Sequence, residues 1–336
     1  MYKVLVNLLR WGIPLGIVAY LLYDAAQQDA LYQLWNGPKD WRLLGLAFLF
    51  FLAAQLVAIV RWYWLVRSLD IPFTWNAALR LGILGYLLTF ISLGAVGGDL
   101  LRAFFVAREQ PTRRAAAAAT VIVDRILGLY SLFLVATVAI LFTNTWDKST
   151  SLGLDVLCQS VFACLGIGTV CLLLVMSGVG ARLESQVERI PRIGKIIRPL
   201  FLAVEAYRRN WKAVFLSILL GIGAQFLLAC TIRTTALAIL TDPPSLVDHL
   251  IIVPLAMLTA ILPLPGQGLG AFEWVLEMLY RKISGTTTGQ GLLVAFGYRL
   301  ITIATALVSA IVYVGNRKEV AEVMREAEAE TEGLPH

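Results

Sequence analysis

Residues 75–108 read WNAALRLGILGYLLTFISLGAVGGDLLRAFFVAR, and residues 246–281 read LVDHLIIVPLAMLTAILPLPGQGLGAFEWVLEMLYR. In both stretches an apolar segment of about one membrane thickness meets a break rich in Gly or Pro. A shorter segment with an acidic residue follows and ends in Arg. Lipid offers no hydrogen bonds, so backbone freed at such a break needs partners from protein or cavity water. We therefore interpret both stretches as re-entrant hairpins, which enter and leave the membrane on the same side.

The composition is that of an integral membrane protein. Of 336 residues, 59% are hydrophobic and 15% are charged, and the mean hydropathy is +0.76. A soluble domain has about 25% charged residues, and one with this composition would aggregate through its exposed apolar surface. Soluble enzyme folds, nucleic-acid binding and disorder are therefore excluded. The net charge of +6 carries little information, because basic loops that set membrane topology account for most of it.

Long apolar runs predict the membrane spans, since a helix of about 20 apolar residues satisfies its own backbone in lipid. The first run is compatible with a signal peptide, but its poor cleavage signal favours an uncleaved anchor. The expected fold is an all-α polytopic membrane protein with about six transmembrane helices, two re-entrant broken-helix hairpins and an inverted repeat. Residues 1–315 form one domain, and 316–336 form a charged cytoplasmic tail. The spans are expected near 4–23, 43–66, 115–141, 152–178, 213–240 and 290–314.

An internal repeat relates the two hairpins. Asp99 follows the first break, and Arg125 lies 26 residues later in the next span. Glu273 follows the second break, and Arg299 lies 26 residues later in its next span. The matching breaks, carboxylates and arginines predict pseudo-repeats.

Loop charges predict the orientation of these repeats, which extend over about 41–141 and 213–314. The basic segments 100–114 and 179–212 are expected on the cytoplasmic side, with both termini. The spans before the two hairpins then run in opposite directions, so the repeats are inverted. Inverted repeats around broken helices are a transporter arrangement, with the site near the midplane where the halves meet.

Ionisable residues inside spans cost about 2.5–3.5 kcal/mol each on insertion scales, so each needs a partner or a function. In one interpretation Arg125 and Arg299 clamp the hairpins through Asp99 and Glu273. In the other the guanidinium groups face a polar cavity and hold a phosphate, and the two roles are compatible. The candidate substrate-binding and transport residues are Asp99, Arg102, Asp124, Arg125, Arg233, Glu273, Glu277 and Arg299.

Several roles stay open within the hairpins. Asp99 either caps the helix that begins near Gly97 or contacts the ligand. Glu277 either shares a proton with Glu273 or forms a surface pair with Arg281. The residues expected at the two breaks are Gly94, Gly97, Gly98, Pro263, Pro265, Gly266, Gly268 and Gly270.

Metal chemistry and cofactors are not expected. All four cysteines lie in apolar runs without a CxxC pattern, which is typical of small hydrophobic residues. The two histidines, His249 and His336, cannot complete a metal site with them.

Four motifs resemble the lysylphosphatidylglycerol synthase transmembrane-region family, a flippase-like membrane domain found alone or fused to an aminoacyl-lipid synthase. They are GGDLLRAFF from Gly97, AAAAATVIVDRILGLY from Ala115, PLPGQGLGAFEW from Pro263 and VAFGYRL from Val294. The resemblance covers about residues 5–315. It implies an integral plasma-membrane protein that translocates lipid. The motif positions carried over are Gly98, Asp99, Arg102, Asp124, Arg125, Gly128, Pro265, Gly266, Gly270, Glu273 and Arg299.

The expected function is therefore non-enzymatic flipping or transport of an anionic or polyprenyl-linked lipid, with the site between the two hairpins. A membrane enzyme acting on a lipid-linked substrate is one alternative, and a small-solute transporter is another. Nothing after residue 315 is large enough for the soluble synthase domain, so lipid aminoacylation is expected to be absent. A membrane lipid is the expected partner, and the oligomeric state is open, a homodimer included.

Overall fold

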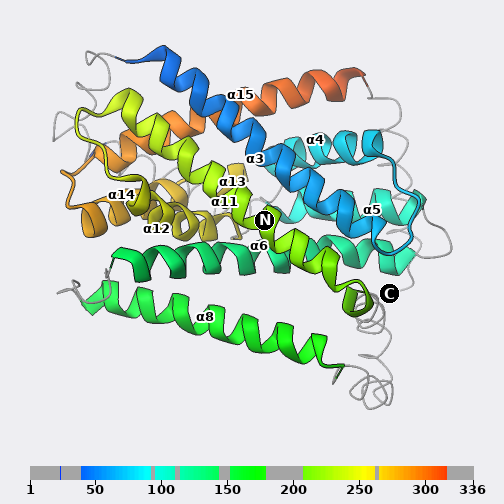
Figure 1. Cartoon of the computed structure of the whole chain (residues 1–336). Coiled ribbons are helices and arrows are strands. Elements are labelled where there is room, and N and C mark those ends of the chain that lie inside the picture. The colour runs from blue at the N-terminus through cyan, green and yellow to red at the C-terminus, as the bar shows by residue number, and fades with distance from the viewer. Residues whose placement is uncertain are drawn as a thin grey trace, which may run out of the picture.

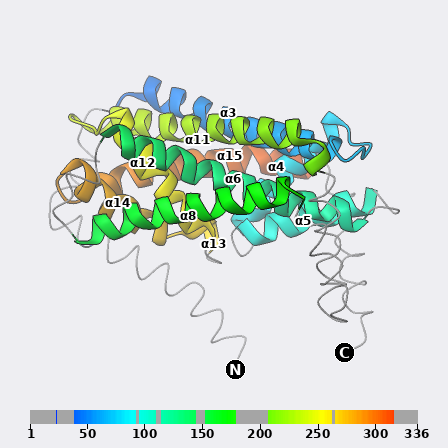
Figure 2. The same ribbon diagram turned by 60° about the horizontal axis from the view of Figure 1, so that its bottom comes forward.

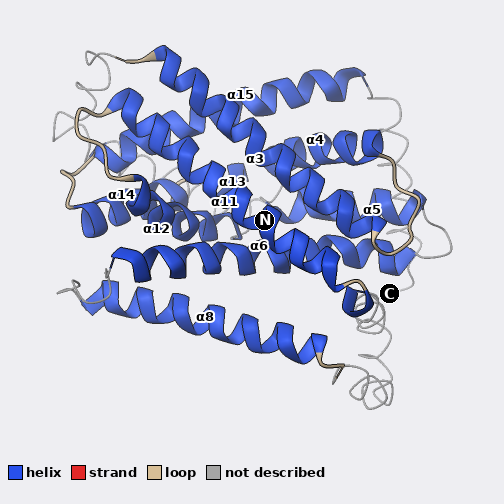
Figure 3. Ribbon diagram, viewed as in Figure 1, coloured by secondary structure: helices blue, strands red, loops and turns tan. Residues whose placement is uncertain are grey.

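The computed structural model describes residues 23, 39–91, 95–109, 114–143, 152–178, 207–261 and 265–315. All regular structure in these ranges is helical, as Figure 3 shows. The elements are α3 (Trp41–Arg67), α4 (Trp75–Ile91), α5 (Ala95–Glu109), α6 (Arg114–Thr143), α8 (Leu152–Met176), α11 (Trp211–Ile239), α12 (Leu246–Met257), η1 (Leu258–Ile261), α13 (Pro265–Gly268), α14 (Ala271–Ser284) and α15 (Gln290–Gly315).

Five of the described helices, α3, α6, α8, α11 and α15, are long and apolar enough to cross a membrane. They coincide with five of the six predicted spans. The predicted span over 4–23 and the predicted tail over 316–336 lie outside the described residues. The chain is thus an all-α polytopic membrane protein.

The described chain runs twice through one order of elements, a long helix, a pair of shorter arms and a second long helix. The first series is α3, α4, α5 and α6, and the second is α11, α12, α14 and α15 with η1 and α13 in its break. The arms pack against each other, α4 on α5 and α12 on α14. In Figure 1 the first pair lies at the right end of the molecule and the second at the left end. The two pairs meet in the middle, where α13 contacts α4.

The second break is built from backbone conformations that favour glycine. Gln267, Gly268 and Gly270 have φ values of 60°, 80° and 82°, in the left-handed region that glycine enters most easily. A Cβ atom on Gly268 would also lie 2.7 Å from the carbonyl oxygen of Thr259. Pro265 is the first residue of α13, a position where its missing N–H costs nothing.

The first break lies earlier than expected. Because α5 begins at Ala95, Gly97 and Gly98 belong to its first turn rather than to the break. A Cβ atom on Gly98 would collide with the carbonyl oxygen of Gly85 and with Thr89 Oγ1, so this glycine lets α5 approach α4 closely. Gly94 and Pro263, both expected at the breaks, lie outside the described residues.

The described residues form two hydrophobic cores, one around each series. One joins α12, α14 and α15 to parts of α3, α4, α6 and α11. The other joins α3, α4, α5 and the first half of α6. Outside both series, α8 packs along α6, as Figures 1 and 2 show. The helix α6 therefore contacts both cores and also α8.

Candidate functional site

The first hairpin is tied to the following span by an ion pair. Arg125 on α6 donates from Nη2 to Oδ1 of Asp99 on α5 at 2.7 Å, and its Nε lies 2.5 Å from Oδ2. The Arg125 side chain is 51% exposed and the Asp99 side chain 20%. Asp99 lies in the second turn of α5, so it is not the capping residue that the sequence suggested. The pair joins α5 to α6 and leaves part of the guanidinium accessible.

The second hairpin has the same connection, but it is enclosed. Arg299 on α15 donates from Nε to Oε1 of Glu273 on α14 at 2.7 Å, and its side chain is only 10% exposed. Glu273 is fully buried, and its Oε2 accepts the backbone N–H of Gly270 at 2.7 Å. The Arg299 guanidinium also stacks on Phe272, 5.5 Å from the ring centre. The carboxylate thus holds both α15 and the backbone at the break.

A third ion pair involves Arg61, which sequence reasoning missed. Arg61 on α3 donates from Nε and Nη2 to the two carboxylate oxygens of Asp124 on α6, at 2.7 and 3.1 Å. Its guanidinium lies between two glycines, since Cβ atoms on Gly128 and Gly221 would come within 3.0 and 3.3 Å of it. Arg61 is close to the end of its predicted span, where arginines usually reach the interface. The available signal was Asp124, since a carboxylate in a span requires a cation.

Arg102 connects α5 to its neighbours rather than standing in a polar cavity. Its Nη2 donates to the carbonyl oxygen of Gly82 at 3.1 Å, and its guanidinium carbon lies 5.6 Å from the centre of the Trp62 ring. A Cβ atom on Gly85 would lie 2.5 Å from its Nε. That Nε is buried and has no hydrogen-bond partner among the described residues. With Arg61 and Arg125, Arg102 gives this half of the molecule three cations near two carboxylates.

Glu277 caps the start of α15. The side chain is 7% exposed, and its carboxylate accepts the backbone N–H groups of Gly289 at 2.8 Å and Leu292 at 2.9 Å. Negative charge is favourable at a helix N-terminus. The surface pair expected with Arg281 is therefore replaced by a buried contact, while Arg281 itself is exposed. Glu273 and Glu277 accept from separate donors.

The second half of the molecule contains a buried polar pair that the sequence did not indicate. His249 and Tyr280 are both fully buried, and His249 Nε2 lies 2.7 Å from the Tyr280 hydroxyl. His249 Nδ1 donates to the carbonyl oxygen of Ser245, which can only accept, so in the neutral ring Nε2 accepts from Tyr280. Arg233 lies on α11, and its buried Nη1 has no hydrogen-bond partner in the described ranges.

Between the two hairpins the described residues pack through aromatic rings. Phe51 contacts Tyr86 and Tyr298 edge to face, and Tyr298 lies against Phe272. The Tyr86 hydroxyl donates to the carbonyl oxygen of Thr302 at 3.1 Å, which links α4 to α15. Among the described residues, these contacts join the two halves across their interface.

A family model for the lysylphosphatidylglycerol synthase transmembrane region matches residues 5–310. The chain belongs to this family. No curated protein and no solved structure matches the chain. As a member of the lysylphosphatidylglycerol synthase transmembrane-region family it is a multi-pass membrane protein, and its three ion pairs all lie within the matched region. No group of residues suited to a metal ion occurs in the described part of the chain.

Proposed function

We propose that this protein moves a lipid with an anionic or polyprenyl-linked headgroup between the leaflets of the plasma membrane, without catalysing a covalent reaction. One observation carries the proposal: each hairpin is tied to the next long helix by an Arg–carboxylate pair with the same separation of 26 residues. Buried charges in a membrane are costly and usually mark a transport pathway. The family supports an action on lipids.

The proposal includes an inverted repeat of about 41–141 and 213–314 within one domain over 1–315, with re-entrant hairpins and cytoplasmic termini. The repeated order of elements supports it, as does the placement of the hairpins at opposite ends of the molecule in Figure 1. In such transporters one half rocks against the other around a site near the midplane. Opening would separate the aromatic contacts between Phe51, Tyr86 and Tyr298.

Arg125 is the residue that we assign to the lipid phosphate. It is the most exposed of the arginines in the three ion pairs, and its planar fork can bind phosphate oxygens in pairs. Arg61 and Arg299 are enclosed with their carboxylates, so we assign them to holding the helices. Asp99 competes with the lipid phosphate for Arg125. Once the lipid has crossed, the Asp99–Arg125 pair would form again and displace the phosphate.

Transbilayer movement in proteoliposomes tests this function. Native lipid extract with chemical labelling of the outer leaflet would report movement, and we expect Arg125→Gln to slow it about tenfold to hundredfold, the effect of one charged hydrogen-bonded contact. Arg281→Gln is the matched control, because Arg281 is exposed and outside the ion pairs. Unchanged movement in Arg125→Gln would contradict the assignment, and no movement by wild-type protein would contradict the function.

A charge exchange separates binding from clamping. The double variant Asp99→Arg/Arg125→Asp keeps an ion pair between α5 and α6 but moves the cation. We expect it to accumulate as folded protein and to lose lipid movement. Restored movement would mean that the pair only holds the hairpin.

A further inference from the structure

An apolar groove runs between α6 and α8. Its volume is about 440 Å³, within the range of about 300–1,000 Å³ that is typical of ligand sites. Ile126, Tyr130 and Phe133 line it from α6, and Cys164, Cys171 and Met176 line it from α8. The two helices are held together across it by a hydrogen bond of 3.2 Å between the hydroxyls of Tyr130 and Thr169. The lining is almost entirely apolar, which suits a hydrocarbon chain.

One end of this groove is basic. Met176 and Tyr207 close the groove there, and the next residue, Arg208, reaches the end of α8, where its Nη1 lies 3.1 Å from a Cβ atom placed on Gly178. Arg209 and Lys212 follow on the same segment and are exposed. In sequence, residues 179–212 hold eight Lys or Arg and three Glu. Basic residues beside a membrane surface attract anionic lipid.

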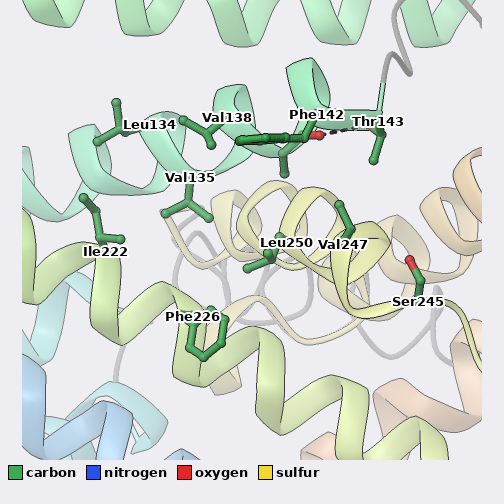
Figure 4. A pocket seen from close by; sticks show the side chains of 11 residues that line it. Leu134, Val135, Val138, Phe142, Thr143, Ile222, Phe226, Ser245, Val247 and Leu250 are labelled. Carbon is green, nitrogen blue, oxygen red and sulfur yellow. Dashed lines mark hydrogen bonds between the residues drawn. The ribbon is translucent and has the colours of Figure 1, made fainter.

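A second apolar groove lacks this feature and gives an internal comparison. Figure 4 shows it between α6, α11 and α12, with Phe142 and Phe226 among its walls, and its volume is about 830 Å³. The polar side chains that line it are the hydroxyls of Thr143 and Ser245. Ser245 donates to the carboxylate of Asp248 at 2.7 Å, so this rim carries negative rather than positive charge.

We propose that the groove between α6 and α8 is a binding site for an anionic phospholipid, with one acyl chain along the groove and the phosphate beside Arg208, Arg209 and Lys212. The apolar walls accommodate the acyl chain of any lipid, and the basic rim selects the anionic headgroup. This site is separate from the ion pairs of the hairpins. It does not depend on lipid movement, because it is defined by binding.

Photolabelling of the wild-type protein in nanodiscs tests the site. The probes are phosphatidylglycerol and phosphatidylcholine with the same diazirine-bearing acyl chain, and the adducts are mapped by mass spectrometry. We expect phosphatidylglycerol to label the groove peptides over 123–133 and 164–176 at least about fivefold more than phosphatidylcholine, the effect of one basic residue at a membrane surface. Labelling around Phe142 and Phe226 should show no preference for phosphatidylglycerol.

Variants separate the two parts of the site. Lys212→Gln should lower the preference for phosphatidylglycerol about fivefold, with phosphatidylcholine labelling unchanged. Cys171→Trp should fill the groove and reduce labelling by both lipids. Val170→Trp, on the exposed face of α8 and outside the groove, is its matched control.

Equal labelling of the groove by both lipids in wild type would overturn the proposal, as would an absence of adducts on these peptides. The second result is expected if an apolar segment of the chain itself, such as 4–23, fills the groove. If Cys171→Trp does not fold, the wild-type labelling pattern decides alone. A protein that binds the lipid here but moves none would contradict the proposed function and leave this site intact.

Discussion

The first and second hairpins hold the same type of ion pair at the same spacing, yet they enclose it differently. In the second, Glu273 is fully buried and Arg299 is 10% exposed, whereas in the first Arg125 is 51% exposed. A buried pair costs a great deal when one partner is removed, because the other stays behind as an enclosed charge, whereas protein covers only about half of the Arg125 side chain in the first pair. The difference teaches that the repeated sequence pattern sets the pairing, and that the surrounding packing decides whether the pair holds the fold or remains available to a ligand.

The largest expected effect is at the enclosed pair. Glu273→Gln leaves Arg299 buried without a counter-charge, and we expect it to lower the free energy of unfolding by about 3–5 kcal/mol. Chemical denaturation in detergent micelles measures this change. Adding Arg299→Met should recover part of the loss, because it removes the unpaired charge. If the Glu273→Gln protein is as stable as wild type, the enclosed pair does not hold the fold, and the proposed difference between the two hairpins is wrong.

A second effect concerns Glu277, which lies on the same arm as Glu273 but farther from the break. Glu277→Gln weakens the two hydrogen bonds to the start of α15, and we expect a loss of about 1–3 kcal/mol. Hydrogen exchange should speed up at Gly289 and Leu292 and stay unchanged in α5. Faster exchange in both hairpins would show that they do not act as separate units.

The space that Gly128 and Gly221 leave for the Arg61 guanidinium, here called the glycine slot, gives a third test. A Cβ atom on Gly221 would collide with the Ser131 hydroxyl, so Gly221→Ala should destabilise the protein by about 1–3 kcal/mol through overpacking. Thermal unfolding measures the loss. Gly223→Ala is the matched control, because a Cβ atom there has no neighbour within 4 Å, and equal losses in the two variants would remove the argument for a slot.

The smallest effect on stability is expected at the exposed pair. Asp99→Asn should lower the free energy of unfolding by only about 1 kcal/mol, the net contribution of one hydrogen bond, because the asparagine carbonyl still accepts from Arg125. Transbilayer movement should slow, because Arg125 loses the competitor that displaces the phosphate. The two readouts, unfolding and movement, are made on the same preparation. A loss of stability as large as that of Glu273→Gln would make both pairs structural.

The long helices and both hairpin pairings could be predicted from the sequence. Span length follows from bilayer thickness, and the pairing of Asp99 with Arg125 and of Glu273 with Arg299 follows from two charges that recur at one spacing. Span length can be read from a local stretch of sequence, and the two pairings can be read from a charge pattern that occurs twice.

The partners fixed by packing between distant helices could not be predicted. Arg61 finds Asp124 only because α3, α6 and α11 meet, and the glycines that make room for it lie on two different helices. Glu277 faces α15 rather than Arg281 because the turn before α15 brings Gly289 and Leu292 to it. In one interpretation Asp99 caps α5, but α5 begins at Ala95, four residues before it. The composition around Ala95 gives no signal for the start of a helix.

The slot around Arg61 has a mechanical consequence. Its guanidinium is attached to α6 through Asp124 and is confined between Gly128 on α6 and Gly221 on α11. Rotation of α6 or α11 about its own axis would move its glycine away and bring a side chain against the guanidinium, so Arg61 fixes which face of each helix is turned toward α3.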